Sequence, residues 1–384
     1  MKARPQTARE SGIALPSFTI AVLAGDGIGP SVVTQALKVI DEVAASGRAE
    51  FELRRGLIGA AALEATGRGL PVETVEVCRS SDAVLLGAVG HPYWDKHAEI
   101  EDRPALALLR LRRELGLYAN LRPVTLAPSI RSLSWLNERA TRDGVDLLIV
   151  RDMSAGLFFG VPRGRRHSKT WNEQEAYDTT TFRPSQVDRI GRLAFEFARR
   201  RSGRLTSVDQ ANILATGRLW REEMTRLAGD YPDIALDHLY VDNCANALVR
   251  EPASFDVIVT DGLFGGILSD EAGSIAGSIG MLPSASVGDG TPGLFEPVHG
   301  SAPKHAGHDR VNPIGTVRSL ALLLSTGLGL HREGEVIEQA ILAVLEGGLR
   351  TYDIAADGDT PVGTEAFGDA IAEETRRLLR RLDS

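Results

Sequence analysis

Short apolar runs alternate with longer amphipathic stretches along most of this chain. Five of the apolar runs are predicted to be buried strands, at residues 18–23, 82–86, 145–150, 205–208 and 255–259. Helices are predicted where apolar residues recur with helical spacing, at 31–45, 187–201, 213–229 and 313–330. Strands that alternate with helices form a largely parallel sheet whose faces the helices cover. The alternation therefore predicts an α/β fold.

Length and charge narrow the class of protein. A chain of 384 residues exceeds one ordinary core, so one large α/β unit or two interleaved domains is expected. The formal net charge of −8 argues against a nucleic-acid partner, because phosphates demand a basic face. No apolar run approaches the length that spans a membrane, so no membrane partner is expected.

The cysteines and the first residues bear on the compartment. Cys78 and Cys244 lie far apart in the sequence, which favours a cytoplasmic protein over one built on disulfides. Lys2, Arg4 and Arg9 have no apolar segment beside them, so no secretory signal is predicted. An organelle-targeting leader is the open alternative, but a frayed tail ahead of the first strand is favoured.

A glycine-rich loop, Gly25-Asp-Gly27-Ile-Gly29-Pro30, follows the first predicted strand. A dinucleotide-binding fingerprint needs its third glycine five positions after the first, where helix and strand pack closely. Pro30 occupies that position here. We therefore predict a tight turn into a helix rather than a cradle for a pyrophosphate.

Eight segments match one family almost residue for residue and occur in that family's order. They lie at residues 23–30, 82–90, 117–124, 146–151, 240–243, 263–271, 280–286 and 295–303. One of them reads Leu-Tyr-Ala-Asn-Leu-Arg-Pro-Val, and another Phe-Glu-Pro-Val-His-Gly-Ser-Ala-Pro. The chain resembles the isocitrate/isopropylmalate dehydrogenase family of metal-dependent β-decarboxylating dehydrogenases, and most of all its 3-isopropylmalate branch.

The resemblance implies a two-domain α/β fold with a largely parallel sheet flanked by helices, distinct from the Rossmann fold. Residues 1–117 and 277–384 would form a large, cofactor-side domain, and residues 118–276 a small one. The polar stretch 160–174 would be an arm that clasps a second subunit. Members of this family are homodimers whose active sites are shared between subunits, so a homodimer is expected.

Three arginines match the family's positions for the substrate carboxylates: Arg112, Arg122 and Arg151. The family oxidises a 2-hydroxy acid that carries a second carboxylate at C3, and arginine offers such a dianion a planar, charged fork. Isolated arginines are more often solvated or paired on helix faces, but their place within the matched motifs favours a binding role. A malate-like dicarboxylate is the expected substrate.

Leu108 and Leu109 precede the first of these arginines. The pair resembles the apolar wall around the alkyl group in isopropylmalate enzymes, which favours a malate with an alkyl substituent at C3, or with none. Plain core packing on a helix is an equal alternative. Ala105 stands where the family has an acid near the cofactor's ribose, so that contact is missing.

The proton relay departs from the family's pattern. Gln210 replaces the lysine of Ser-Val-Asp-Lys-Ala-Asn, and an amide cannot carry the proton of the substrate hydroxyl at neutral pH. The family's tyrosine, which helps to protonate the enolate, is placed at Phe182, where the ring remains and the hydroxyl is lost. His167 and Arg183 are candidate replacements for these groups.

The metal site departs as well. The family motif Phe-Gly-Asp-Ile-Leu-Ser-Asp reads here Phe264-Gly-Gly-Ile-Leu-Ser-Asp270, so Gly266 replaces one of three metal carboxylates. Asp270 and, from a second subunit, Asp242 would remain. Two carboxylates with substrate and water can still hold Mg²⁺ or Mn²⁺, at lower affinity.

The adenosine part of the cofactor is predicted to lie on the loop after residue 303. NAD-dependent relatives place an acid there for the ribose 2′-hydroxyl, whereas NADP-dependent isocitrate dehydrogenases place a lysine that attracts the 2′-phosphate. Lys304 therefore favours NADP over NAD, and Tyr352 matches an NADP-type position, although Ala356 replaces the arginine that usually follows it. The predicted cofactor-binding residues are His299, Gly300, Ser301, Ala302, Pro303, Lys304, His305, Val311, Asn312 and Tyr352.

Two functions from different classes fit this pattern. The first is an NAD(P)-dependent dehydrogenase of a malate-like 2-hydroxy acid whose chemistry stops at hydride transfer or uses a substituted proton relay. The second is a paralogue that has lost catalysis and binds nucleotide or substrate as a regulatory or structural partner. Intact arginine and cofactor motifs are expected under both functions.

Overall fold

The computed structural model describes residues 15–290 and 292–382, so the predicted N-terminal tail lies outside the described residues. All five predicted strands and all four predicted helices are present within a few residues of the expected bounds. In this part of the chain, none of the helices combines the length and apolar character needed to cross a bilayer.

A sheet of ten strands runs through the described residues in the order β2-β1-β3-β12-β11-β4-β5-β10-β8-β9. Six neighbouring pairs are parallel. The three pairs at the centre, β12–β11, β11–β4 and β4–β5, are antiparallel. The predicted largely parallel sheet is confirmed, with an antiparallel centre. The strands of this sheet are β1 (Ser17–Gly25), β2 (Glu50–Arg55), β3 (Ala83–Ala88), β4 (Ala119–Leu126), β5 (Val145–Asp152), β8 (Arg204–Asp209), β9 (Ala235–Tyr240), β10 (Val257–Thr260), β11 (Pro283–Val287) and β12 (Gly293–Pro297).

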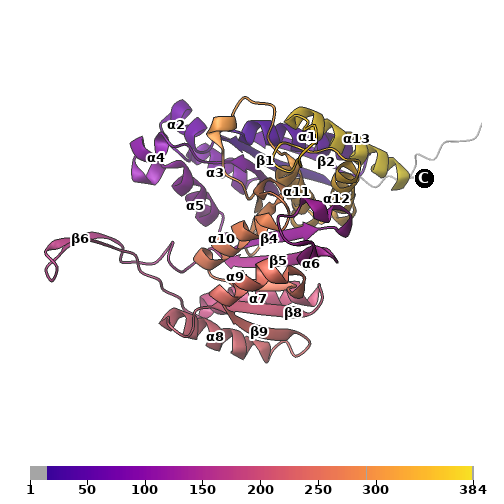
Figure 1. The fold of residues 1–384 in the computed structure, drawn as a ribbon. Coiled ribbons are helices and arrows are strands. Elements are labelled where there is room, and N and C mark those ends of the chain that lie inside the picture. Colours follow the sequence, from indigo (N-terminus) through magenta and orange to yellow (C-terminus); the bar gives the residue numbers. More distant parts are fainter. Residues whose placement is uncertain (1–14, 291, 383–384) are drawn as a thin grey trace, which may run out of the picture.

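Helices flank the sheet in two groups (Figure 1). In one group two helices pack beside β1, β3 and β12 and two more cover those helices, while the other group packs beside β5, β8 and β10. The first group is α1 (Gly29–Ala45), α11 (Ile314–Leu322), α12 (His331–Glu346) and α13 (Thr364–Leu382). The second is α7 (Pro184–Arg199), α8 (Ala215–Ala228) and α10 (Gly262–Glu271). Other α-helices are α2 (Ala60–Thr66), α3 (Val72–Arg79), α4 (Trp94–His97), α5 (Pro104–Glu114), α6 (Glu138–Thr141) and α9 (Val241–Arg250).

The predicted domain boundary falls within the sheet. Residues 118–276 would begin at β4, which pairs with β11 of the other predicted domain. The sheet is therefore continuous across the boundary, and the division into two domains stays a prediction.

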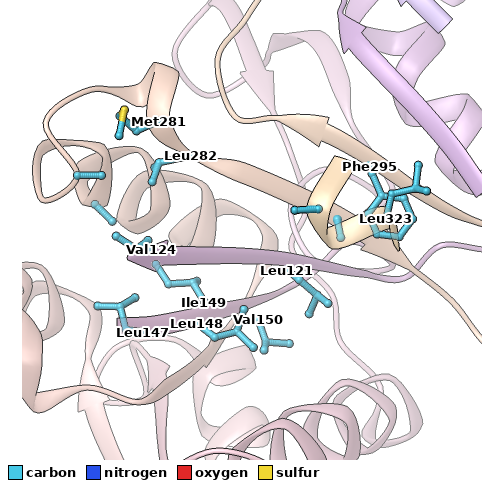
Figure 2. Close-up of a cluster of buried hydrophobic side chains, with 14 of the residues drawn as sticks. Leu121, Val124, Leu147, Leu148, Ile149, Val150, Met281, Leu282, Phe295 and Leu323 are labelled. Carbon is cyan, nitrogen blue, oxygen red and sulfur yellow. The ribbon is translucent and has the colours of Figure 1, made fainter. Parts of the chain in front are cut away.

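Strands β4 and β5 run through the main hydrophobic core (Figure 2). Leu147–Val150 of β5 is buried, together with Leu121 and Val124 of β4. Phe295 and Leu282 belong to the same cluster. A strand covered on both faces has a continuous apolar run, and each fully buried large apolar side chain contributes about 1.5–3 kcal/mol. The sheet centre is therefore a rigid support for the polar residues that it carries.

Residues 160–174, predicted to be an exposed loop or arm, lie mostly in a hairpin. Strand β6 (Gly164–Ser168) pairs antiparallel with β7 (Glu173–Tyr177), and the hairpin extends away from the body of the molecule (Figure 1). Trp171 between the two strands is 75% exposed. An arm-like extension is present, and its clasp on a second subunit stays a prediction.

The glycine loop after β1 forms a tight turn into α1, as predicted. Gly25 has a φ of +72°, and a Cβ there would lie 2.0 Å from the carbonyl oxygen of Ala88. A Cβ at Gly27 would lie 2.0 Å from the carbonyl oxygen of Ser301, to which the Ile28 N–H donates at 2.8 Å. The loop therefore supports the segment that carries the predicted cofactor residues.

Candidate active site

Two predicted substrate arginines lie on the antiparallel pair β4–β5. Asn120 of β4 is directly opposite Arg151 of β5, and side chains two residues apart on a strand share a face. Arg122 therefore shares the face of Arg151. Its Nε donates to Asn120 Oδ1 at 2.8 Å, and its Nη1 lies 3.4 Å from both Ser269 Oγ and Asp270 Oδ1. Strand register thus brings together two arginines that are distant in sequence.

The third arginine reaches the cluster from helix α5. Arg112 lies in the last turn of this helix, and its guanidinium pairs with the buried carboxylate of Glu296 on β12. Its charge lowers the pKa of both Arg122 and Arg151, so all three cations lie within electrostatic reach of one another. We call Arg112, Arg122 and Arg151 the arginine cluster. Sequence reasoning missed Glu296, although it lies within a matched segment.

The side chain of Arg151 lies along the first turns of α10. Its Nε donates to the carbonyl oxygen of Gly262 at 2.5 Å. A Cβ at Gly265 would lie 2.7 Å from Arg151 Cγ, and a Cβ at Gly266 would lie 3.0 Å from Nη2. Asp261 caps this helix by accepting a hydrogen bond from the Phe264 N–H at 2.8 Å. The glycines of α10 therefore provide the space in which Arg151 lies.

Burial shapes the electrostatics of the arginine cluster. Desolvation, followed by repulsion from Arg122 and Arg112, lowers the pKa of Arg151 to about 9. Desolvation also lowers the pKa of Arg122. A pKa of about 9 still leaves the Arg151 guanidinium protonated at neutral pH. Three buried or half-buried cations that repel one another form a site that an anion would stabilise.

The predicted metal ligands do not gather within the described chain. Asp270 is 61% exposed and pairs with Arg122, while Asp242 lies in the first turn of α9 and accepts from the Asn243 N–H at 3.0 Å. Gly266 offers no donor atom. Among the residues that the structure describes, no group of three His, Cys, Asp or Glu side chains is placed to hold a metal ion. These donors do not by themselves fit a divalent cation.

The aromatic residue at the arginine cluster is Phe158 rather than Phe182. The guanidinium carbon of Arg151 lies 5.7 Å from the centre of the Phe158 ring. Phe182 instead packs edge-on against Trp220, with ring centres 5.5 Å apart, and a Cβ at Gly156 would lie 3.0 Å from its ring. The predicted tyrosine position at Phe182 therefore lacks a contact with the arginines. Phe158 follows Arg151 by seven residues, and this short spacing was the signal that sequence reasoning overlooked.

The remaining relay candidates make contacts of their own. The Gln210 amide donates to Asn212 Oδ1 at 3.0 Å at the end of β8. His167 lies on the β6–β7 hairpin, where its Nε2 is 3.0 Å from Asn172 Oδ1. Arg183 is exposed at the start of α7, where its N–H donates to Gln186 Oε1. No hydrogen bond or ion pair among the described residues joins these three to the arginine cluster.

The two leucines on α5 have different surroundings. Leu108 packs against the hydrophobic cluster formed by β1, β3 and neighbouring helices. Leu109 lines a cavity of about 860 Å³, together with Leu106, Phe158 and Phe159. Charged side chains also line this cavity, and Phe158 joins it to the arginine cluster through its contact with Arg151. Core packing therefore describes Leu108, whereas Leu109 lines open space, as a residue of a binding pocket would.

The predicted cofactor segment is anchored at one end and exposed at the other. Ser301 is buried, and its Oγ donates to the carbonyl oxygen of Gly90 at 2.6 Å. Burial lowers the pKa of His299, so this imidazole is neutral at pH 7. Asn312 is buried and donates to Asp353 Oδ2 at 3.1 Å. Lys304 and His305, in the short helix η6 (Pro303–His305), are exposed.

An additional cation lies beside this segment. The guanidinium carbon of Arg310 is 3.9 Å from the centre of the Tyr352 ring, whose side chain is 63% exposed. Sequence reasoning identified Tyr352 but missed Arg310, because the two residues come from separate loops. Ala302, between the anchored and exposed parts, adopts a φ of +36°. This loop carries positive charge toward solvent.

Comparison with known proteins agrees with this architecture. The chain matches the family model for isocitrate/isopropylmalate dehydrogenase over residues 19–371. It is 51% identical to a 3-isopropylmalate dehydrogenase of Nitratidesulfovibrio vulgaris, with 93% of this chain and 99% of the relative covered. It is 49% identical to that of Oleidesulfovibrio alaskensis, with 92% and 98% covered.

Solved structures give the same result. An isocitrate dehydrogenase from Methylococcus capsulatus superimposes with a TM-score of 0.80 at 34% identity, covering 94% of this chain and 99% of that one. A β-decarboxylating dehydrogenase from Thermococcus kodakarensis superimposes with a TM-score of 0.75 at 35% identity, covering 94% and 97%. The chain therefore belongs to the isocitrate/isopropylmalate dehydrogenase family, and it is an oxidoreductase of the dehydrogenase class.

Proposed function

We propose that this protein transfers hydride between NADP(H) and a malate-like 2-hydroxy acid or its 2-keto acid, as an oxidoreductase of the 3-isopropylmalate dehydrogenase type. The observation that carries the proposal is the arginine cluster, which gathers three cations from α5, β4 and β5 beside a cavity of mixed apolar and charged lining. Its planar guanidinium groups suit the two carboxylates of such a substrate. The cavity beside Leu109 suits an alkyl substituent at C3.

The relatives are named 3-isopropylmalate dehydrogenases, and that family generally uses NAD and a divalent metal. Here the groups expected to move protons are changed. The Gln210 amide does not ionise near neutral pH, so it cannot act as a general acid or base, and Phe158 has no hydroxyl. General acid–base groups typically contribute about 10²–10⁴-fold each, so the decarboxylating step is proposed to be slow relative to hydride transfer.

The charge of the cofactor loop supports NADP over NAD. Lys304 is exposed where NAD-dependent relatives have an acid. Arg310, six residues further along the chain, stacks on Tyr352. Ala356 lacks the arginine expected after Tyr352, and we propose that Arg310 supplies the missing cation. A 2′-phosphate would gain charge-assisted hydrogen bonds from these side chains.

A homodimer with shared sites is part of the proposal. Gln210 and Asp242 make no hydrogen bond or ion pair with the arginine cluster within the described chain, which suits donation to the site of a second copy. The β6–β7 hairpin extends from the body, as an arm that clasps a partner would (Figure 1). Exposed apolar side chains on α10 and on the loop after β8, Ile267 and Ile213, suit the same contact.

The proposal is tested by mixing the purified protein with malates that differ at C3, each nucleotide and Mg²⁺, and following the absorbance of reduced cofactor. Turnover with NADP supports the dehydrogenase. Tight nucleotide binding without turnover for any pair would instead favour the second function, a paralogue that binds without catalysis.

Two reconstructed variants separate the phenylalanine positions. One combines Gln210→Lys, Gly266→Asp and Phe158→Tyr, and the other replaces the last change with Phe182→Tyr. Because only Phe158 lies against Arg151, the first variant is expected to recover decarboxylation and the second is not. Recovery by the Phe182 variant alone would return the tyrosine position to residue 182.

A further inference from the structure

We propose that the arginine cluster binds its dicarboxylate directly, without a divalent cation between ligand and protein. The inference rests on the proposed function for the class of ligand, a four-carbon dicarboxylate with or without a hydroxyl. The evidence is the position of Arg151 on α10, the engagement of Asp270, and the balance of charge around the cluster.

Helix α10 is shaped to receive a cation where the family has a metal ligand. Gly262, Gly265 and Gly266 lie under Arg151, from its Nε at the Gly262 carbonyl to its Nη2 beside Gly266. A side chain at Gly266 would force that guanidinium to move by a few tenths of an ångström, since its Cβ would lie 3.0 Å from Nη2. The loss of this carboxylate therefore removes a metal ligand and gives Arg151 room close to the helix.

The surviving carboxylate, Asp270, is exposed but already has a cation beside it. Asp270 Oδ1 lies 3.4 Å from Arg122 Nη1, so a metal ion bound to Asp270 would compete with a cation already in place. A second ligand would have to come from Asp242 of another copy, and the third position is Gly266. Mg²⁺ keeps several waters and accepts few carboxylates, but the Arg122 guanidinium beside Asp270 opposes its charge.

The cluster itself is short of negative charge. Arg112 pairs with Glu296 and Arg122 with the exposed Asp270. Among the described residues Arg151 forms no ion pair, and Asp270 and the N-cap residue Asp261 stabilise its charge through space. Within the described part of the chain, the guanidinium of Arg151 donates to a backbone carbonyl, that of Gly262. A carboxylate placed against Arg151 would satisfy a buried cation that now lacks a close anionic partner.

Isothermal titration of the intact protein with malate and with succinate tests the proposal, in EDTA and in millimolar Mg²⁺. Succinate lacks the hydroxyl that a metal would chelate, so it reports on the arginines alone. We expect both ligands to bind in EDTA, and Mg²⁺ to change the affinity for malate by no more than about twofold, which is under ~0.5 kcal/mol. The proposal would be overturned if malate bound only in the presence of Mg²⁺ while the affinity for succinate did not change with Mg²⁺.

The variant Asp270→Asn should change the affinity for malate in opposite directions, depending on whether a metal ion or the arginines bind the ligand. If Asp270 is a metal ligand, its loss weakens malate binding. If the arginines bind malate directly, removing an exposed competing carboxylate strengthens binding, by roughly twofold to fivefold for a solvent-screened pair. Gly266→Asp is the converse: it should weaken binding in EDTA and make it respond to Mg²⁺.

A direct readout of the metal completes the design. Electron paramagnetic resonance of Mn²⁺ should show free ion with the native protein and malate, and bound ion with Gly266→Asp. If neither malate nor succinate binds under any condition, both the proposed substrate class and this inference are wrong. If malate binds only with metal, the substrate class stands and the inference alone is wrong.

Discussion

The arginine cluster and the cofactor loop both present positive charge, but they do so in different physical settings. Arg122 is 9% exposed and is positioned by a strand register, whereas the Tyr352 side chain beside Arg310 is 63% exposed and both residues lie on loops. Charges that are shielded from water interact strongly, and exposed charges are screened by solvent and salt. One charge substitution should therefore have a large effect at the cluster and a small one at the loop.

The difference also bears on how this chain departs from its relatives. In the cluster, the substitution to Gly266 is accompanied by a specific position for Arg151, because little space is free beside α10. On the loop, Lys304 is exposed in a short helix and requires no such adjustment. Changes in ligand chemistry at the buried site are thus coupled to packing, while the nucleotide preference of the loop can change through single residues.

The largest effect is expected from Arg122→Gln. The loss of a buried charge-assisted contact costs about 3 kcal/mol, so dicarboxylate affinity should fall about 100-fold, measured by titration calorimetry. Arg122→Lys is the matched control, since it keeps the charge but not the fork, and should lose less. Thermal unfolding of both variants checks that the fold persists. Equal affinities for native protein and Arg122→Gln would contradict the binding role of the cluster.

The buried carboxylate that follows Arg151 in strand β5 should make stability depend on pH. Asp152 is 1% exposed, and desolvation raises its pKa to about 6 despite hydrogen bonds from Ser154 and Ala155. A raised pKa favours the protonated folded form, so its contribution to stability is present below about pH 4 and is lost as the pH rises through about 6.

The variant Asp152→Asn isolates this contribution. The difference in unfolding free energy between native protein and variant should change by about 2–3 kcal/mol between pH 4 and pH 7, with the native protein losing stability relative to the variant. Urea unfolding at several pH values measures it. Parallel pH profiles for the two proteins would show that Asp152 does not titrate in this range.

The same glycine substitution in both regions tests the role of packing. Gly265→Ala places a Cβ 2.7 Å from Arg151 Cγ, so overpacking should cost about 2 kcal/mol of unfolding free energy. Gly300→Ala on the cofactor segment has no atom within 4 Å of its Cβ and should be nearly neutral in the unliganded protein. Thermal melts of the two variants give the comparison, and equal losses would remove the distinction between the two regions.

Much of this arrangement could be predicted from the sequence. The apolar run of β5 identified a buried strand, and the matched motifs identified Arg112, Arg122 and Arg151. The position of Arg151 along α10 could not be predicted, because it depends on the space above Gly265 and Gly266. Sequence motifs identify residue types, whereas side-chain paths depend on packing.

Contacts between separate loops could not be predicted from the sequence either. The stacking of Arg310 on Tyr352 joins residues on two connections, and no periodicity links them. Phe158, which follows Arg151 on the same connection, lies against it, whereas the resemblance predicts the ring at Phe182. The sequence shows that both rings are present, but only the structure shows which ring faces the site.

The smallest effect is expected from Lys304→Asp on the cofactor loop. An exposed charge contributes about 1 kcal/mol, so NADP affinity should fall roughly fivefold while NAD affinity is unchanged or rises slightly, measured by fluorescence titration of the reduced nucleotides. Lys169→Asp on the β6–β7 hairpin makes the same change of net charge away from the loop, and should leave both affinities as they are.

Raising the salt concentration should reduce the effect of Lys304→Asp, because ions screen an exposed pair, and should leave that of Arg122→Gln largely intact. A salt response of equal size for both variants would mean that the buried cluster and the loop do not differ in their electrostatic setting.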